Sequence, residues 1–253
     1  MVVVSSESLR PSFLLARHPG RLPTLVQRVR PVMEQAGLFS GGWENVYNHC
    51  VHAGTAMYVL ATGIGLDPSE RETAACAGLL HDYDQRMKRE QARVGPDLKM
   101  GQGSITPVDW KVLATIESRE PHLPPGWEHC RDAIKVTGCL WPHQAPEGWS
   151  WLEKMMRWVD TVTGNQLTDH GFVPFEKRIS EMAAVKRELD EVGRLVYGMP
   201  TFERLLKITR IIDEELFNAL VERECIPSTA YSEAAVLDYV VDQSKPLLKE
   251  ILG

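Results

Sequence analysis

The stretch Ala77-Gly78-Leu79-Leu80-His81-Asp82 closes a run of apolar and small residues that begins near residue 71. A histidine and an aspartate side by side at the end of such a run are unusual, because aspartate is seldom buried unless it is paired or binds a metal. Taken alone, the pair is equally well explained as a solvated helix end. Two other stretches change that balance, Asn48-His49-Cys50 upstream and Trp158-Val159-Asp160 downstream. Together they supply imidazole and carboxylate ligands for a divalent metal.

Helical spacing predicts that the first two stretches meet. A helix over about 43–64 places His49 on one stripe with apolar residues at steps of three and four, Val46, Ala53, Ala56, Met57 and Leu60. A second helix is expected from Ser69, an N-cap with Glu72 as its capping-box partner. Its face of small residues, Ala74, Ala77 and Gly78, leads to His81. Two closely packed helices would therefore bring His49 and His81 to one point.

The third stretch lies on a predicted helix over 150–163. Asp160 falls on its apolar side, four residues after Met156. A carboxylate that points into a core needs a partner, and a metal ion is one such partner.

The order His49, then Ala-Gly-Leu-Leu-His81-Asp82, then Arg-Trp-Val-Asp160, resembles the HD-domain superfamily of metal-dependent phosphohydrolases. The resemblance covers roughly residues 43–165. It implies an all-α fold, an HD-type helical bundle with a helical C-terminal extension. It also implies an enzyme that hydrolyses a small phosphorylated compound, a phosphate monoester or a nucleotide, through a metal-activated water. The implied metal ligands are His49, His81, Asp82 and Asp160.

The donor set suits Mn, Fe, Co, Ni, Zn or Mg and does not choose among them. Two-metal members of the superfamily place extra histidines between the His-Asp pair and the last Asp, where His122 and His143 stand. If both bind, Asp82 is the natural bridging ligand; the alternative is that both are exposed loop histidines. His52, one turn after His49, could replace it as ligand or lie in the second shell or at the surface. His129 and His170 are expected at the surface.

Charged residues after the His-Asp pair are further candidates for the site. Asp84 would act as a general base or hold a water, with an exposed acidic residue as the alternative. Arg86, a candidate catalytic group, would hold a substrate phosphate with Lys88 and Arg89, unless the three form a solvated helix face. Arg119 and Lys135 are similar candidates. The sequence Tyr83-Asp84-Gln85 matches neither the cyclic-di-nucleotide subgroup nor the nucleotidase-type subgroup, so neither assignment carries over.

Two alternatives stay open. The first is a di-iron oxygenase on the same scaffold, which would require His122 and His143 as ligands. The second is a non-catalytic helical sensor or binding module with a structural metal site.

Composition indicates an ordinary globular protein. The 253 residues are 43% hydrophobic and 25% charged, with a net charge of −6. An acidic balance argues against a general nucleic-acid surface but allows a small phosphorylated substrate. No apolar run approaches the ~20 residues of a membrane helix. The N-terminus lacks the basic segment of a signal peptide, and the five scattered cysteines form no Cys-x-x-Cys pair, so a cytoplasmic protein without membrane association is expected.

Three segments are expected, packed as a single domain. Residues 1–42 form an N-terminal leader and helix, 43–165 the HD-type metal-binding core, and 166–253 the helical extension. Within the extension, helices are predicted near 175–197, 201–224 and 232–251. This extension is also the expected surface for a homodimer.

Overall fold

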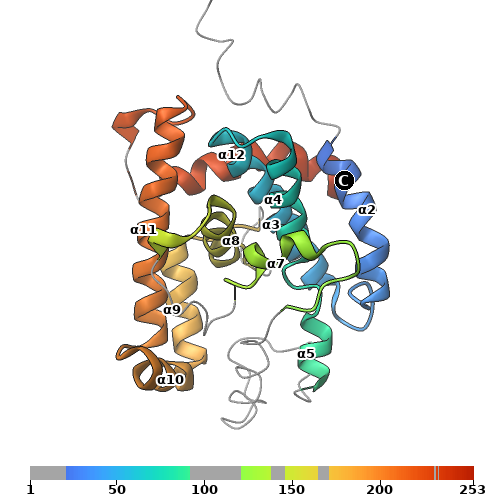
Figure 1. Cartoon of the computed structure of the whole chain (residues 1–253), viewed down its shortest axis with the longest axis horizontal. Helices are drawn as coiled ribbons and strands as arrows, with labels where there is room; N and C mark the ends of the chain where they lie inside the picture. The colour runs from blue at the N-terminus through green and yellow to red at the C-terminus, as the bar shows by residue number, and fades with distance from the viewer. Residues whose placement is uncertain (1–20, 92–120, 138–145, 165–170, 231, 233) are drawn as a thin grey trace, which may run out of the picture.

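The computed structural model describes residues 21–91, 121–137, 146–164, 171–230, 232 and 234–253. It confirms the predicted all-α fold (Figure 1). Within the described residues, extended pairing is limited to one isolated antiparallel bridge, Thr163–Phe172. The α-helices are α2 (Arg21–Gln35), α3 (Glu44–Gly63), α4 (Pro68–Leu80), α5 (Gln85–Gln91), α7 (Arg131–Ile134), α8 (Trp151–Val162), α9 (Phe175–Val185), α10 (Arg187–Tyr197), α11 (Thr201–Glu222) and α12 (Ala235–Leu252), with 3-10 turns η2 (Glu128–Cys130), η3 (Pro146–Gly148) and η4 (Ser228–Ala230).

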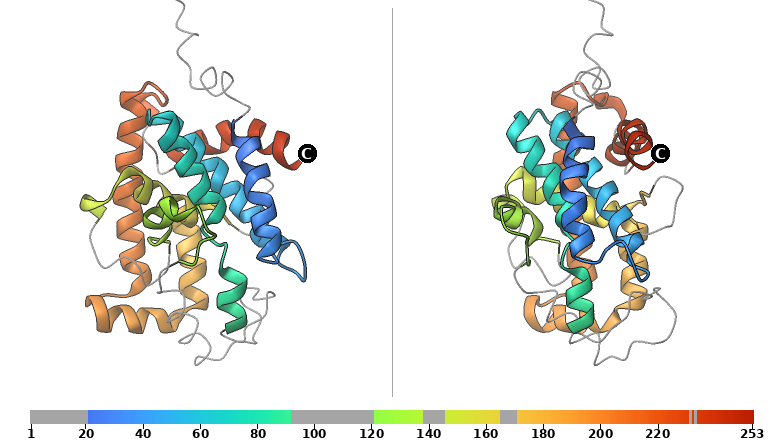
Figure 2. Two further views of the ribbon diagram at one scale, coloured as in Figure 1. Left: turned by 45° about the vertical axis from the view of Figure 1, so that its right-hand side comes forward. Right: turned by 90° about the vertical axis from the view of Figure 1, so that its right-hand side faces the viewer.

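Helix α3 is the central element of the fold. Most of its residues are buried, including the whole stripe predicted from helical spacing. Helices α4, α8 and α12 all pack against it. In Figure 1, α12 crosses the top of the molecule, and the views in Figure 2 show α2 lying along the α3–α4 pair.

Two glycines allow α3 and α4 to approach closely. A Cβ on Gly78 would lie 2.7 Å from the main-chain carbonyl of Ala53, and a Cβ on Gly54 would lie 2.6 Å from Leu79 Cγ. Real Cβ atoms do not tolerate such distances, so both positions require glycine for packing rather than for backbone conformation. The prediction that small residues bring these helices together is confirmed.

The start of α4 differs from the prediction. The N-cap is Asp67 rather than Ser69, and its side chain accepts a hydrogen bond from the main-chain N–H of Glu70, 2.9 Å away. The Glu70 side chain accepts from the main-chain N–H of Asp67 in return. Pro68 suits the first helical position, where its missing N–H costs nothing, so the capping box begins two residues earlier than expected.

The C-terminal helices form a second group that packs on α8. The helix predicted over 175–197 is divided in two, because Lys186 adopts φ −111° and ψ 43°, outside the helical region. Helix α11 is tied to α8 by a hydrogen bond from Trp158 Nε1 to Asp213 Oδ1 (2.7 Å) and by an ion pair between Lys154 and Glu215 (2.7 Å). These links, one buried and one partly exposed, fix α8, and with it Asp160, against the extension.

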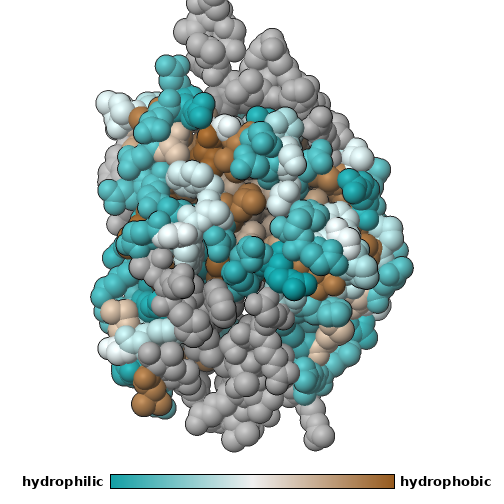
Figure 3. All heavy atoms as spheres, viewed as in Figure 1, coloured by the Kyte–Doolittle hydropathy of each residue, from teal (hydrophilic) through white to brown (hydrophobic). Residues whose placement is uncertain are grey.

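On the face shown in Figure 3, the described surface is mainly hydrophilic, with scattered hydrophobic areas. Among the described residues, the large hydrophobic side chains that are exposed come from four different helices, Met87, Leu195, Ile211 and Leu252. No helix in the described part of the chain is long and apolar enough to cross a membrane.

Replacing Gly78 with alanine should destabilise the protein, because the added Cβ meets the main chain of α3, which cannot move aside as a flexible side chain would. We expect a loss of about 1–3 kcal/mol in the free energy of unfolding, measured by denaturant titration. Gly148→Ala is the matched control, since a Cβ there meets nothing within 4 Å. Equal stability of the two variants would contradict the close-packing argument.

Candidate metal centre

The four predicted ligands lie on or just after three helices, α3, α4 and α8, and both α4 and α8 pack against α3. His49 lies in the second turn of α3, and Asp160 lies near the end of α8. His81 follows the last residue of α4 with helical φ and ψ (−59°, −31°). Asp82 lies in the turn between α4 and α5. The turn allows two consecutive side chains to face the same point.

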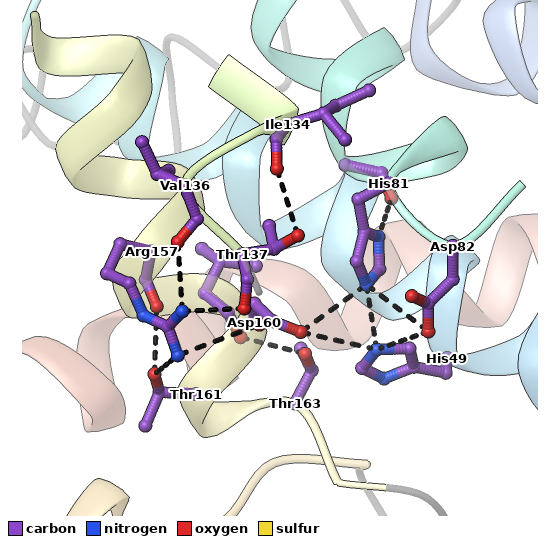
Figure 4. A network of polar contacts seen from close by, with 12 residues as sticks. His49, His81, Asp82, Ile134, Val136, Thr137, Arg157, Asp160, Thr161 and Thr163 are labelled. Carbon is purple, nitrogen blue, oxygen red and sulfur yellow. Dashed lines mark hydrogen bonds and ion pairs between the residues drawn. The ribbon is translucent and has the colours of Figure 1, made fainter. Parts of the chain in front are cut away.

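The four side chains converge (Figure 4). The two imidazole Nε2 atoms, of His49 and His81, are 2.9 Å apart. Asp82 Oδ2 is 3.8 Å from both of them. Asp160 Oδ1 approaches from the opposite side, 3.9 Å from the His49 nitrogen and 3.6 Å from the His81 nitrogen. The structure thus brings together all four residues predicted as ligands.

Hydrogen bonding fixes the ring orientation of His81. Its Nδ1 lies 2.7 Å from the main-chain carbonyl oxygen of Gly78, which can only accept, so Nδ1 carries a proton. The 2.9 Å contact between the two Nε2 atoms then requires one further proton between them in the metal-free protein. Anchoring of one ring nitrogen by a carbonyl is the usual arrangement of a metal-ligating histidine.

The protonation of the two rings is pushed in opposite directions. Burial, and then the charge of His81, lowers the pKa of His49 to about 4. Burial also acts to lower the pKa of His81, but the carboxylates of Asp82 and Asp160 and the Cys50 thiol outweigh it and hold that pKa well above 6.5. Burial acts to raise the pKa of Asp160, while His81 and Arg157 prevail and lower it to about 2. The shared proton therefore belongs to His81 near neutral pH.

The donor set fits a divalent ion. Ligands about 2.1 Å from an octahedral ion lie about 3.0 Å apart when adjacent and about 4.2 Å apart when opposite. The Nε2–Nε2 distance matches the first value, and the nitrogen–oxygen distances lie between the two. Ligand atoms of His49, His81 and Asp160 all lie within 4.8 Å of one another. These residues could hold a metal ion, and among the described residues this is the one such group of three.

A buried arginine lies behind Asp160. Arg157 is 1% exposed and donates hydrogen bonds from Nη1 to the main-chain oxygens of Val136 (2.9 Å) and Thr137 (2.6 Å). Its Nη2 is 3.8 Å from Asp160 Oδ2, the oxygen that faces away from the histidines. Sequence reasoning gave this residue no role. The available signal was a cation within the buried run Met155–Val159.

The other predicted histidines lie outside this group. His52 places its Nδ1 2.7 Å from the Asn48 carbonyl oxygen and packs against Phe172 and Gly171. His122 is exposed, and its ring stacks on Tyr83 with centroids 6.3 Å apart. It is therefore beside the turn that carries Asp82 without belonging to the close cluster.

His129 is exposed and stacks on Trp127, as expected of a surface residue. His143, the second candidate for a two-metal site, lies outside the described residues, as does His170.

Asp84 corrects a prediction. It is 3% exposed, so the expectation of an exposed acidic residue is wrong. One oxygen pairs with Lys88 Nζ (3.0 Å), and the other accepts a hydrogen bond from the main-chain N–H of His122 (2.8 Å). These contacts engage both oxygens, so Asp84 holds the segment that begins at residue 121 against α5 and is a poor candidate for a general base.

The cations predicted to hold phosphate are also engaged elsewhere. Arg86 donates to the Gly37 carbonyl oxygen (2.8 Å) and pairs with Glu90 (2.8 Å), which pins the loop between α2 and α3. Arg89 lies over the Trp43 ring, 5.5 Å from its centroid. Lys88 is the partner of Asp84, and Lys135 pairs with Asp132. Arg119 lies outside the described residues.

Arg178 is a cation that sequence reasoning missed. It lies in the first turn of α9, which packs against α8 just after the Thr163–Phe172 bridge. Its charge contributes, behind burial and His81, to the lowered pKa of His49, so this charge acts on the centre. It is half-buried, and among the described residues no carboxylate forms an ion pair with it.

Comparisons with protein-family models, curated proteins and solved structures find no match to this chain. Functional inference therefore rests on the geometry of the centre and on the motif residues themselves.

Metal binding should release a proton, because an ion at the centre must displace the one that His81 carries. Below the raised pKa of His81, the apparent dissociation constant should fall about tenfold for each unit of increasing pH, and level off above it. Isothermal titration calorimetry of Mn²⁺ in buffers of different ionisation enthalpy measures the released proton. An observed enthalpy that does not depend on the buffer would contradict this protonation state.

Proposed function

We propose that the protein is a metal-dependent phosphohydrolase of the HD type, acting on a phosphate monoester or nucleotide. The observation that carries the proposal is the meeting of two imidazole nitrogens 2.9 Å apart with two carboxylates on opposite sides. The order of the four residues along the chain, His49, His81-Asp82, Asp160, is that of the superfamily motif. A divalent ion held there would lower the pKa of a water and offset charge on a phosphoryl oxygen.

The residues of the chain have distinct parts in this proposal. His49 and His81 supply neutral nitrogen donors, once His81 has lost its proton. Asp82 and Asp160 supply two negative charges that compensate a divalent ion in a largely buried position. Asp82 is the more exposed of the two carboxylates, 28% against 21%. It lies in a turn beside Tyr83 and is the better placed to contact a water that enters from solvent.

Arg178 supports an anionic substrate. A half-buried guanidinium that forms no ion pair with a described residue is available to an anion, and a phosphoryl group provides the oxygen pair that a guanidinium binds best. Its charge also acts on His49, one of the residues of the centre. The proposal therefore assigns phosphate binding to Arg178 in place of Arg86, Lys88 and Arg89.

The described cluster favours one metal ion. Asp82 Oδ2 lies 3.8 Å from both histidine nitrogens of the group His49, His81 and Asp160, whereas the ring contact of His122 is with Tyr83. The di-iron oxygenase alternative requires both His122 and His143. Of these two, His143 lies outside the described residues, and the contacts of the described residues do not favour the oxygenase.

Metal content and phosphatase activity should be lost together. His49→Ala removes one nitrogen donor, whereas His52→Ala, one turn along the same helix, leaves the four ligands in place. We expect about one metal per chain and phosphate release from some member of a monoester and nucleotide panel for the parent and His52→Ala, and neither for His49→Ala. Plasma mass spectrometry and a phosphate assay measure both. Two irons per chain with oxygen consumption would favour the oxygenase instead, and turnover by His49→Ala at the parent's rate would defeat the proposal.

Replacing Arg178 should weaken substrate binding and leave the metal. Arg178→Ala removes this cation, and we expect KM to rise at least tenfold with metal content unchanged. Lys177→Ala, an exposed neighbour, is the control and should behave as the parent does. An unchanged KM in Arg178→Ala would remove this residue from the site.

A further inference from the structure

Arg157 is an arginine in the core, where a positive charge is costly unless a negative charge lies near it. Its Nη1 is satisfied by the main-chain oxygens of Val136 and Thr137, at 2.9 Å and 2.6 Å, where α7 ends. Nη2 lies 3.4 Å from Thr161 Oγ1. These acceptors are neutral: they satisfy N–H groups of a guanidinium that is 1% exposed but bring no negative charge to it.

A carboxylate of the metal centre brings negative charge to Arg157. Among the described residues, the carboxylate paired with Arg157 is Asp160, whose Oδ2 lies 3.8 Å from Nη2. The other oxygen, Oδ1, faces the imidazole pair, 3.6 Å from the His81 nitrogen. One carboxylate thus has an oxygen toward a fixed cation and an oxygen toward the centre, as Figure 4 shows.

We propose that Arg157 is a positioning residue of the metal centre: by holding Oδ2 of Asp160, it offers the metal a single oxygen of that carboxylate in a fixed orientation. The proposal rests on the metal site of the proposed function and is independent of the substrate. Because main-chain carbonyls hold the guanidinium, the orientation of Asp160 depends on how the end of α7 is seated against α8.

A buried ion pair with a purely structural role would not change metal affinity. Removing Arg157 has two effects on that affinity, and they have opposite signs. Loss of a nearby positive charge should tighten binding of the metal ion, because it removes a Coulomb repulsion. Loss of carboxylate orientation should weaken it, and changes of this kind typically cost 10–100-fold in metal affinity. Weaker binding after removal of Arg157 therefore indicates positioning.

The experiment measures Mn²⁺ dissociation constants by calorimetry for the full chain. Arg157→Lys keeps the charge but cannot hold two carbonyls and the carboxylate together, and Arg157→Met keeps approximate size without charge. We expect both to bind at least tenfold more weakly. Thr201→Val is the control: it loses the buried hydrogen bond from Thr201 Oγ1 to the Leu189 main-chain oxygen, which involves no residue of α8, so its melting temperature should fall while its dissociation constant stays within twofold of the parent.

A double-mutant cycle shows whether Arg157 acts through Asp160. In an Asp160→Asn background the effect of Arg157→Lys on the dissociation constant should shrink to less than twofold, because the carboxylate that it orients is gone. An undiminished effect in that background, or parent-like affinity of Arg157→Lys, overturns the proposal.

A measurement without metal covers the case in which the Arg157 variants fold poorly. Asp160→Asn leaves the guanidinium buried without its carboxylate, so its metal-free melting temperature should fall further than that of Asp82→Asn, and Arg157→Met added to it should recover part of the loss. Equal losses in the two aspartate variants contradict the pairing. A parent that binds Mn²⁺ but hydrolyses no phosphate ester defeats the proposed function and leaves this inference standing, whereas a parent that binds no divalent ion defeats both.

Discussion

The close approach of α3 and α4 at Gly54 and Gly78 is the constraint on which the centre depends. Helices with ordinary side chains at their contact lie 8–10 Å apart, and glycine lets the backbones come nearer. Here a Cβ on Gly78 would lie 2.7 Å from the main chain of α3. The same residue supplies the carbonyl that orients the His81 ring. Helix packing and ring orientation are thus set at one position, and the two imidazoles meet as a result.

The carboxylate side of the centre is held differently. Asp160 lies on α8, and α8 is fixed by its hydrogen bond and ion pair to α11 and by the hydrogen bonds of Arg157 to the main chain just after α7. The C-terminal helices carry no motif of their own, yet they determine where the last ligand lies. This explains why a helical extension without recognisable chemistry packs on the helices that carry the ligands.

Sequence periodicity predicted what depends on local spacing. The buried stripe of α3 and the helical order could be read from steps of three and four, because an apolar face must point inward, and the same steps placed His49, His81 and Asp160 on inward-facing sides. Asp82, which lies in a turn, came from the resemblance to the HD motif alone. The roles of charged residues could not be read in this way. A charged run such as 82–89 is typical of a solvated helix face. Asp84 and Arg86 nevertheless bind the main-chain groups of His122 and Gly37, which only the tertiary fold brings close. Arg178 was missed for the same reason, since nothing local distinguishes it from other helical arginines, whereas the position of Arg157 inside the apolar run Met155–Val159 was a local signal. The division of the predicted 175–197 helix at Lys186 could not be predicted, because no glycine or proline lies at that point in the sequence.

The separation of the ligands along the chain has a consequence for the order in which the centre assembles. His49 and His81 are 32 residues apart and sit on consecutive helices, so the loop that must close to join them is short. Asp160 arrives only when a distant helix docks. A partly folded chain can therefore present the nitrogen donors before the second carboxylate, and an early-bound ion would act as a nucleus that draws α8 into place. Binding of the ion and the docking of α8, which is the long-range step of folding, would then occur together.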